Sequence, residues 1–487
     1  MTSPGAAADM ALELEIFVTP GLGDNSYLVA SGDEAVVVDP QRDAWRFVEV
    51  AERRGWRIRH VLETHVHNDY VSGAHEIRAA TGAELVVPAR GRYTFDHRPA
   101  DDGDDVAIGD LRIVARATPG HTPEHLAWEV RAANSSEPRA VLTGGSLLVG
   151  SAGRSDLLGP DLAESLAREQ YRSIQRLAAL PDAVRILPTH GAGSFCVSGS
   201  AGGDARTSTL GAERFGNPAV WGTDEGAFVR GHLGGLSAYP TYYRYMAPLN
   251  RAGAPVVGGP PTVTPVDADA VADLAADGAW IVDARDRHAF AAAHLPGSIN
   301  VELDDSFGGY VGWVVPFGER IVLVLPDPVG SSGASAATQL FRIGYDRVAG
   351  VLHGGIDAWR ASGRPTATYP TASMGDLYRE RRERLERGTS VAVLDVRQAE
   401  EWRATPAVGD AQRIFVGDLA DRLDEVRRDD EVWVHCASGY RAAVAASLLD
   451  RAGVRVRLVA SGGGEDWARY EAATPPPTSD PGVASLG

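Results

Sequence analysis

The sequence predicts a protein of mixed α and β structure in three domains, an α+β domain followed by two α/β domains. Three observations predict this organisation. Residues 1–250 alternate short apolar strands with helical segments, residues 251–265 are rich in Pro and Gly, and two later segments share one order of strands and helices. Such alternation is typical of layered α/β domains, and 487 residues suit about three domains at about 100–200 residues each.

In the first 250 residues, alternating apolar positions predict strands and 3.6-residue spacing predicts helices. The expected helices are residues 42–55 and 161–180. The expected strand segments, some of them running into loops, are residues 14–19, 25–30, 34–40, 57–67, 84–89, 111–120, 125–131, 140–148 and 185–190.

The second half of the chain contains an internal repeat. VDARD and GGIDAWR of the first copy correspond to LDVRQ and GGGEDWAR of the second. Because the stretch 251–265 has the composition of a linker, we place the two copies at 266–368 and 372–471. Residues 472–487 are expected to be a disordered tail.

Composition and charge exclude several classes of function. The 47 basic residues against 65 acidic ones leave a net charge of −18, which makes nucleic acid an unfavourable partner. There is no apolar run of about 18 residues, as a membrane span requires, and the first residues lack the features of a signal peptide. We therefore expect a cytoplasmic protein with no membrane partner.

Only two cysteines occur, Cys196 and Cys436. This count excludes a disulfide framework and a zinc site that needs several cysteines. Both remain candidates for reactive thiols.

Histidines follow several of the expected strands in the first domain. His65, His67 and Asp69 lie in THVHNDY, His121 lies in TPGHT, and His190 lies in PTHG. Alternate side chains on an extended segment point the same way. Imidazole and carboxylate groups at one sheet edge are ligands that suit a first-row transition metal.

These motifs, in this order, resemble those of the metallo-β-lactamase superfamily, and residues 1–250 most resemble its persulfide dioxygenases. The resemblance also covers LTGGSLLVGSAGRSDLLG and HGAGSFC. It implies an αββα sandwich with a mononuclear Fe²⁺ site at one edge. His65 and His121 match the iron-binding histidines of that family, and His67, Asp69 and His190 match the remaining metal positions of the superfamily.

The resemblance implies roles for two further residues. Arg154 matches an arginine that the family associates with the thiol substrate. Cys196 matches the cysteine of a motif in dioxygenase–rhodanese fusions, where it would carry a persulfide near the metal. The alternatives are an ordinary arginine and a small buried apolar side chain.

Two positions depart from the family pattern. Gly145 replaces the aspartate that supplies the third iron ligand, and Tyr70 replaces the histidine of the second metal. Tyr70 argues against a dinuclear hydrolase and is a candidate to hydrogen-bond a bound ligand. The loss at Gly145 leaves three alternatives for the metal, which are Fe²⁺, Zn²⁺ or another metal, and none. The possible replacements for the missing ligand are a three-histidine site of His65, His67 and His121, or the carboxylate of Asp69.

The second repeat resembles an active rhodanese. Cys436 ends a strand and Arg441 lies near the start of the next helix, as in the Cys-x-x-Gly-x-Arg loop of that family, and Asp395 and Arg397 match its first strand. Loop amides and a helix N-terminus stabilise an anion on the sulfur. In the first repeat Pro326 falls at about the place of Cys436, so this repeat is expected to be an inactive rhodanese.

The sequence therefore predicts a persulfide dioxygenase and sulfurtransferase. Its expected partners are O₂ and a low-molecular-weight thiol persulfide such as glutathione persulfide, and we expect a homo-oligomer. Two alternatives stay open at this point. One is a sulfur carrier with a degenerate metal site, and the other is a metal-dependent thioester hydrolase of the glyoxalase II type.

Overall fold

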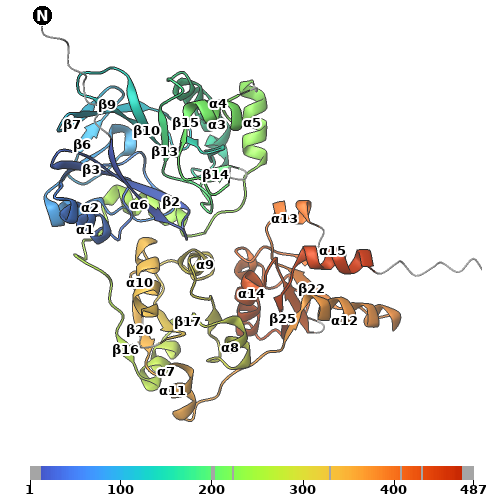
Figure 1. Ribbon diagram of the computed structural model, residues 1–487. Helices are drawn as coiled ribbons and strands as arrows, with labels where there is room; N and C mark the ends of the chain where they lie inside the picture. The colour runs from blue at the N-terminus through green and yellow to red at the C-terminus, as the bar shows by residue number, and fades with distance from the viewer. Residues whose placement is uncertain are drawn as a thin grey trace, which may run out of the picture.

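The computed structural model describes residues 12–198, 203–221, 224–327, 331–405, 408–428 and 431–473. An N-terminal sandwich is followed by two smaller α/β domains (Figure 1). The fold class predicted from the sequence is thereby confirmed. Of the tail expected at 472–487, residues 474–487 lie outside the described residues.

The sandwich contains two six-stranded sheets and a small third sheet. The first sheet has the order β1-β2-β3-β4-β5-β6, with bounds Glu13–Thr19, Asp24–Ser31, Glu34–Val38, Arg57–Leu62, Glu84–Pro88 and Arg98–Ala100. The second has the order β15-β13-β10-β9-β8-β7, with bounds Ser208–Thr209, Arg185–Pro188, Pro138–Gly144, Leu126–Ala132, Leu111–Ala117 and Asp105–Ile108. The third pairs β11 (Leu147–Leu148) with β12 (Ser151–Gly153) and β12 with β14 (Val197–Ser198).

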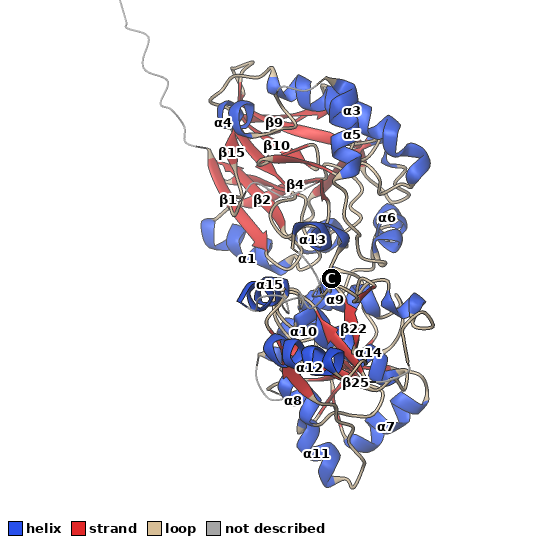
Figure 2. Cartoon of the chain, turned by 90° about the vertical axis from the view of Figure 1, so that its right-hand side faces the viewer, coloured by secondary structure: helices blue, strands red, loops and turns tan. Residues whose placement is uncertain are grey.

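Helices cover both outer faces of the sandwich (Figures 1 and 2). On the side of the first sheet lie α1 (Trp45–Arg54) and α2 (Ala74–Thr81), with η1 (Ala89–Gly91) after β5. On the side of the second sheet lie α3 (Pro160–Ala178), α4 (Leu210–Gly216) and α5 (Glu225–Gly234). The last helix of the domain is α6 (Tyr243–Ala252).

The alternation of side chains along β2 explains the layers. Tyr27 and Val29 pack between the two sheets, whereas Leu28 and Ala30 pack in the cluster of α1 and α2. Successive residues of a strand point to opposite faces, and both faces of this sheet are covered. As a result, β2 is buried along its whole length.

The two C-terminal domains share one topology. The first has the parallel order β16-β20-β19-β17-β18, and the second repeats it as β21-β25-β24-β22-β23. The first contains β16 (Pro265–Val266), α7 (Ala268–Ala276), β17 (Trp280–Asp283), α8 (Arg287–Ala292), β18 (Ile299–Asn300), α9 (Phe307–Val314), β19 (Ile321–Val324), α10 (Ser332–Arg342), β20 (Val348–Leu352) and α11 (Gly355–Ala361). The second contains β21 (Thr371–Ser373), α12 (Met374–Glu386), β22 (Ala392–Asp395), α13 (Ala399–Ala404), β23 (Gln412–Arg413), η2 (Leu419–Arg422), β24 (Val432–His435), α14 (Tyr440–Arg451), β25 (Val456–Ser461) and α15 (Gly464–Ala473).

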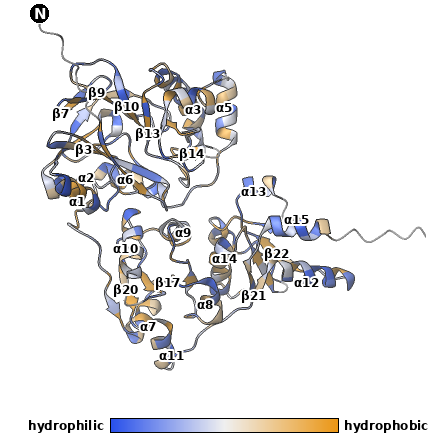
Figure 3. Ribbon diagram, in the orientation of Figure 1, coloured by the Kyte–Doolittle hydropathy of each residue, from blue (hydrophilic) through white to orange (hydrophobic). Residues whose placement is uncertain are grey.

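An apolar core runs through all three domains. It includes Val71, Tyr242 and Met246 of the sandwich, and it extends to Cys436 in the last domain. Trp313 of α9 connects the three domains, because its ring packs edge-to-face against Phe195 at 5.7 Å and against Phe415 at 4.9 Å. Apolar residues concentrate in the sheets, and α12 is mainly hydrophilic (Figure 3). Among the described residues, no helix is long and apolar enough to cross a membrane.

Candidate functional site

Three histidines meet at one end of the sandwich because each follows a strand. His65 comes after β4, His121 after β8 and His190 two residues after the end of β13. His190 forms an isolated bridge with Asp24 of β2. One ring nitrogen of each lies within 4.8 Å of the other two. All three side chains are buried.

A hydrogen bond orients each of the three rings through Nδ1. The backbone carbonyl of Arg154 accepts from His121 at 2.6 Å, and Asp24 Oδ1 lies 2.8 Å from Nδ1 of His190. His65 Nδ1 lies 2.8 Å from Thr64 Oγ1. That hydroxyl donates to Asp39 Oδ2, so its lone pair accepts from the ring. With the proton on Nδ1, each ring keeps its Nε2 lone pair for a ligand.

Two of these Nε2 atoms, those of His65 and His190, are buried with no hydrogen-bond partner within the described part of the chain. Burial lowers the pKa of all three histidines, so the rings are neutral. A neutral imidazole held through its other nitrogen is the usual form of a metal-bound histidine. The residues present therefore fit a transition-metal ion held by His65, His121 and His190.

His67 has different surroundings from the other three. Its Nε2 lies 2.9 Å from Glu63 Oε2, 3.2 Å from Asp39 Oδ1 and 3.1 Å from the Tyr70 hydroxyl. Burial alone lowers the pKa of His67, but the carboxylates outweigh it and hold the pKa well above its usual value. Because these carboxylates engage Nε2 of His67, the three histidines that converge in the structure are His65, His121 and His190, in place of the expected set of His65, His67 and His121.

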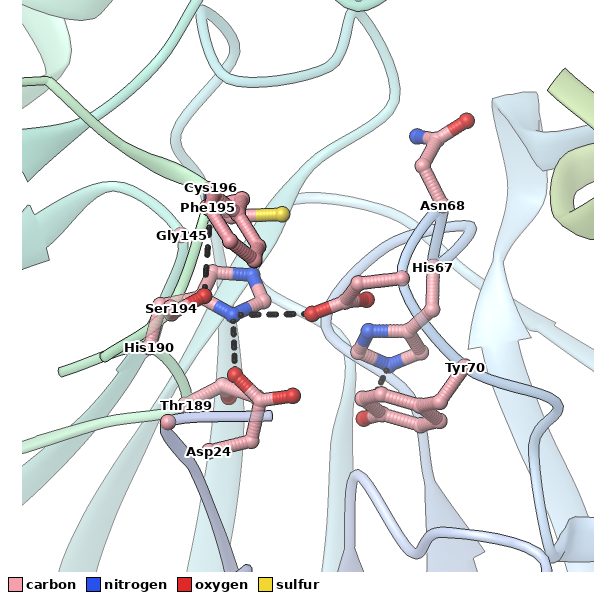
Figure 4. A network of polar contacts seen from close by, with 12 residues as sticks. Asp24, His67, Asn68, Tyr70, Gly145, Thr189, His190, Ser194, Phe195 and Cys196 are labelled. Atoms are coloured by element: carbon pink, nitrogen blue, oxygen red, sulfur yellow. Dashed lines mark hydrogen bonds and ion pairs between the residues drawn. The ribbon is translucent and has the colours of Figure 1, made fainter. Parts of the chain in front are cut away.

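Tyr70 belongs to the same buried network. Its ring stacks on His67, with centroids 4.4 Å apart, and its hydroxyl lies 3.1 Å from His67 Nε2 (Figure 4). The hydroxyl also donates to the Asp39 carbonyl at 3.2 Å. These two contacts occupy the hydroxyl that a bound ligand would need. The side chain thus fills the place of the second-metal histidine and holds His67.

Asp69 lies beside the same ring nitrogen of His190 as Asp24, with Oδ2 3.3 Å from Nδ1. His67, Asp69 and His190 also offer atoms within 4.8 Å of one another, as do Asp39, His65 and His67. Burial raises the pKa of Asp24 and of Asp69 to about 7. A cation bound to His190 would favour the carboxylate form of both residues.

The absence of a side chain at Gly145 leaves space for the ring of His121. A Cβ atom built there would lie 2.6 Å from Cγ and 2.7 Å from Nε2 of His121. The residue that removes the expected aspartate ligand therefore also makes room for a histidine ligand.

His125 is a neighbour of this centre that the motifs did not single out, although it follows His121 by four residues. Its Nε2 accepts from the backbone N–H of Gly145 at 2.9 Å, and its Nδ1 lies 2.8 Å from Thr118 Oγ1. Both ring nitrogens are engaged. His125 supports the loop and is not a candidate ligand.

Arg154 and Cys196 are neighbours, because the backbone N–H of Arg154 donates to the carbonyl of Cys196 at 2.8 Å. The guanidinium of Arg154 binds Asp156 through two hydrogen bonds of 2.6 and 2.8 Å, and it also donates to the carbonyls of Phe195 and Ser237. Its side chain is buried, so it holds the segment whose carbonyl orients His121. Cys196 is buried too, and burial raises the pKa of its thiol well above the usual value.

Substitution of Asp24 tests whether His190 binds the metal. We expect Asp24→Ala to weaken metal binding about 10–100-fold, because the partner that orients a ligating histidine is lost. Asp24→Asn keeps an acceptor and should weaken binding less. Competition with a chromophoric chelator measures both affinities, and an unchanged affinity in Asp24→Ala would contradict the proposed role of His190.

The second candidate site is the loop between β24 and α14. Cys436 directly follows β24, and the backbone N–H of Gly439 donates to its sulfur at 3.1 Å. Arg441 forms a two-pronged ion pair with Glu401, at 2.5 and 2.7 Å. Arg397 pairs with Asp395 inside the domain.

The register of the two repeats refines the position that corresponds to Cys436. Asp283 of β17 pairs with Val324, and the corresponding Asp395 of β22 pairs with His435. The next residue is Leu325 in the first repeat and Cys436 in the second. Leu325, one residue before the expected Pro326, therefore occupies the cysteine position.

Comparison with known proteins agrees with this architecture. A model of the metallo-beta-lactamase superfamily matches residues 19–190, and a model of the rhodanese-like domain matches residues 267–362 and 378–470. A crystal structure of a metallo-beta-lactamase from Staphylococcus aureus subsp. aureus COL has 29% sequence identity and a TM-score of 0.62, and the match covers 70% of this chain and 99% of that one.

Two curated relatives each match a little over a third of this chain. The hydroxyacylglutathione hydrolase of Pseudomonas entomophila is 32% identical over 181 residues, which cover 36% of this chain and 66% of that protein. That of Cereibacter sphaeroides (strain ATCC 17023) is 32% identical over 187 residues, which cover 37% and 67%. The chain thus spans about two thirds of the length of these relatives. It belongs to the metallo-beta-lactamase superfamily and carries two rhodanese-like domains behind the superfamily domain.

Proposed function

We propose that the protein oxidises a low-molecular-weight thiol persulfide at an iron site in the sandwich and transfers sulfane sulfur through Cys436. The observation that carries the first activity is the set of His65, His121 and His190, each oriented through Nδ1 and offering Nε2. The observation that carries the second is the Cys436 loop.

In the oxidation, one O₂ and one water convert the outer sulfur of the persulfide to sulfite and release the thiol. Ferrous iron, when bound, would supply the activation of O₂ that protein side chains cannot provide. His65, His121 and His190 would hold it. Three neutral ligands leave the charge of a divalent cation uncompensated, which favours the binding of an anionic persulfide sulfur.

In the transfer, the thiolate of Cys436 attacks the outer sulfur of the donor. The new bond joins that sulfur to Cys436 Sγ, while the S–S bond of the donor breaks and its thiolate leaves. The N–H of Gly439 is aimed at the sulfur of Cys436. A charge-assisted hydrogen bond of this kind stabilises a sulfur anion before and after transfer.

The test is O₂ consumption with glutathione persulfide, using the full chain loaded anaerobically with ferrous iron. We expect O₂ uptake with formation of sulfite, and its loss in His121→Ala. Cys436→Ser should keep this activity and lose sulfur transfer from thiosulfate to cyanide. No O₂ uptake with intact sulfur transfer would overturn the oxidation and leave the sulfurtransferase.

Thioester hydrolysis is the second candidate, because the curated relatives are hydroxyacylglutathione hydrolases. Such hydrolysis uses a metal-activated water, often between two metals. Tyr70 and the His67 network occupy the second-metal position here, which disfavours this chemistry. Turnover of S-lactoylglutathione by the zinc-loaded protein, without O₂ uptake by the iron-loaded protein, would favour the hydrolase.

A further inference from the structure

One peptide unit of the sulfur-transfer loop is held from two sides. The N–H of Gly439 donates to Cys436 Sγ at 3.1 Å, and the carbonyl of Ser438, in the same peptide, accepts from Arg287 Nη1 at 2.9 Å. A peptide unit is planar. The atom that fixes the carbonyl of Ser438 therefore also fixes the direction in which the N–H of Gly439 points.

The arginine comes from the other, cysteine-free rhodanese-like domain. Arg287 is the first residue of α8, and its guanidinium lies against Gly439 at a point where a Cβ atom would be only 2.5 Å from Nη1. Gly439 has a φ of +100°, in the left-handed region that favours glycine. Glycine at this position thus serves the turn of the loop and also admits the side chain of Arg287.

Arg287 is preorganised before it reaches the loop. Glu302 binds it through Nε at 2.6 Å and Nη2 at 2.8 Å, and both side chains are largely buried. The remaining nitrogen, Nη1, is the one that donates to Ser438. A paired guanidinium of this kind loses little conformational freedom when it forms one more hydrogen bond.

A second contact holds the residue on the other side of Gly439. The hydroxyl of Tyr440 donates to the carbonyl of Glu302 at 3.0 Å and lies 3.2 Å from Asp304 Oδ1. Its ring packs on Tyr310 of α9, with centroids 5.1 Å apart. The cysteine-free domain therefore contacts the loop at the two residues that flank Gly439.

We propose that the cysteine-free domain forms part of the Cys436 site, with Arg287 as a positioning residue for sulfur transfer. This inference rests on the sulfur transfer proposed above. Arg287 acts through the Ser438–Gly439 peptide, which it orients and polarises so that its N–H stabilises a thiolate or persulfide at Cys436. The two rhodanese-like domains then make one catalytic unit, in which one supplies the thiol and the other fixes the loop.

The experiment compares Arg287→Ala with Arg360→Ala in the full chain. Arg360 lies in α11 of the same domain, where it is exposed and pairs with Asp357 at 3.6 Å. We expect Arg287→Ala to lower the kcat of thiosulfate:cyanide sulfur transfer about 10-fold with little change in KM, the loss typical of one charge-assisted hydrogen bond. Arg287→Lys should recover part of this loss, and Arg360→Ala should behave as the wild type.

A second readout does not require turnover. The rate of alkylation of Cys436 by iodoacetamide, followed by mass spectrometry of its peptide as a function of pH, reports the stability of the sulfur anion. We expect the midpoint of this profile to move to higher pH in Arg287→Ala and to stay in place in Arg360→Ala. A wild-type protein without sulfur transfer would overturn the proposed sulfurtransferase, while this profile would still decide the role of Arg287.

Tyr440→Phe is a second variant that tests the inference if Arg287→Ala does not fold. It removes only the hydroxyl that reaches Glu302 and Asp304, and we expect it to lower kcat by about 3-fold, as a neutral hydrogen bond would. Unchanged turnover and an unchanged alkylation profile in every folded variant of Arg287 and Tyr440 would overturn the inference.

Discussion

The His190→Ala variant is expected to lose metal binding and O₂ uptake while keeping its fold. His190 offers one of three convergent ring nitrogens, and its Nε2 has no other hydrogen-bond partner among the described residues. Since loss of an outer partner alone weakens binding about 10–100-fold, loss of a ligand should weaken it by at least about 100-fold. Titration with Fe²⁺ under anaerobic conditions, followed by metal analysis after desalting, measures the effect.

His67→Ala is the matched control, and we expect the opposite pattern. His67 lies between the carboxylates of Glu63 and Asp39, so its removal leaves buried charge without a partner. Breaking such a pair costs about 3–5 kcal/mol, which urea unfolding of the metal-free protein should show. Metal binding by the folded variant should persist. Loss of metal in His67→Ala together with full binding in His190→Ala would establish the set of His65, His67 and His121 instead.

The Gly145→Ala variant should also lose most of its metal affinity, although it adds only a methyl group. The new Cβ would lie 2.6 Å from Cγ of His121, so the ring has to move away from the other two ligands. Because metal sites tolerate ligand distances only within about 0.2 Å, we expect affinity to fall by at least about 10-fold. The measurement is the same chelator competition as for Asp24→Ala.

Gly231→Ala in α5 is the control for this substitution. A Cβ atom there has no neighbour within 4 Å beyond its own helix, so metal affinity should not change. Gly145→Asp is a sharper version of the test. It restores the aspartate of the family pattern, but the same Cβ displaces His121, so we expect no recovery of affinity. A gain of affinity in Gly145→Asp would contradict the steric argument.

The spacing of apolar residues was sufficient to predict the strands and helices in which that spacing is regular. The segment 25–30 lies within β2, the segment 185–190 contains the whole of β13, and the amphipathic segment 161–180 corresponds to α3. Two helices that the pattern did not predict have a physical reason for being missed. α5 contains three glycines and α6 contains Pro248, so neither shows the composition of a stable isolated helix.

Sequence alone determined which chemical groups the protein has and where along the chain they lie: histidines at strand ends, Gly145 in place of a carboxylate, and a cysteine in a loop before a helix. Those features are local. Tertiary structure decided which groups act together. His67 and His190 are equivalent as motif residues, but Glu63 and Asp39 surround the first and Asp24 orients the second.

The same dependence on tertiary structure explains why the sequence did not predict a role for Arg287. Nothing in the segment around this arginine indicates a role at Cys436, because the contact joins positions that lie about 150 residues apart. Which ring nitrogen is free, and which carbonyl an arginine reaches, depend on hydrogen-bond partners that distant segments bring to the site. Only the folded chain specifies those partners.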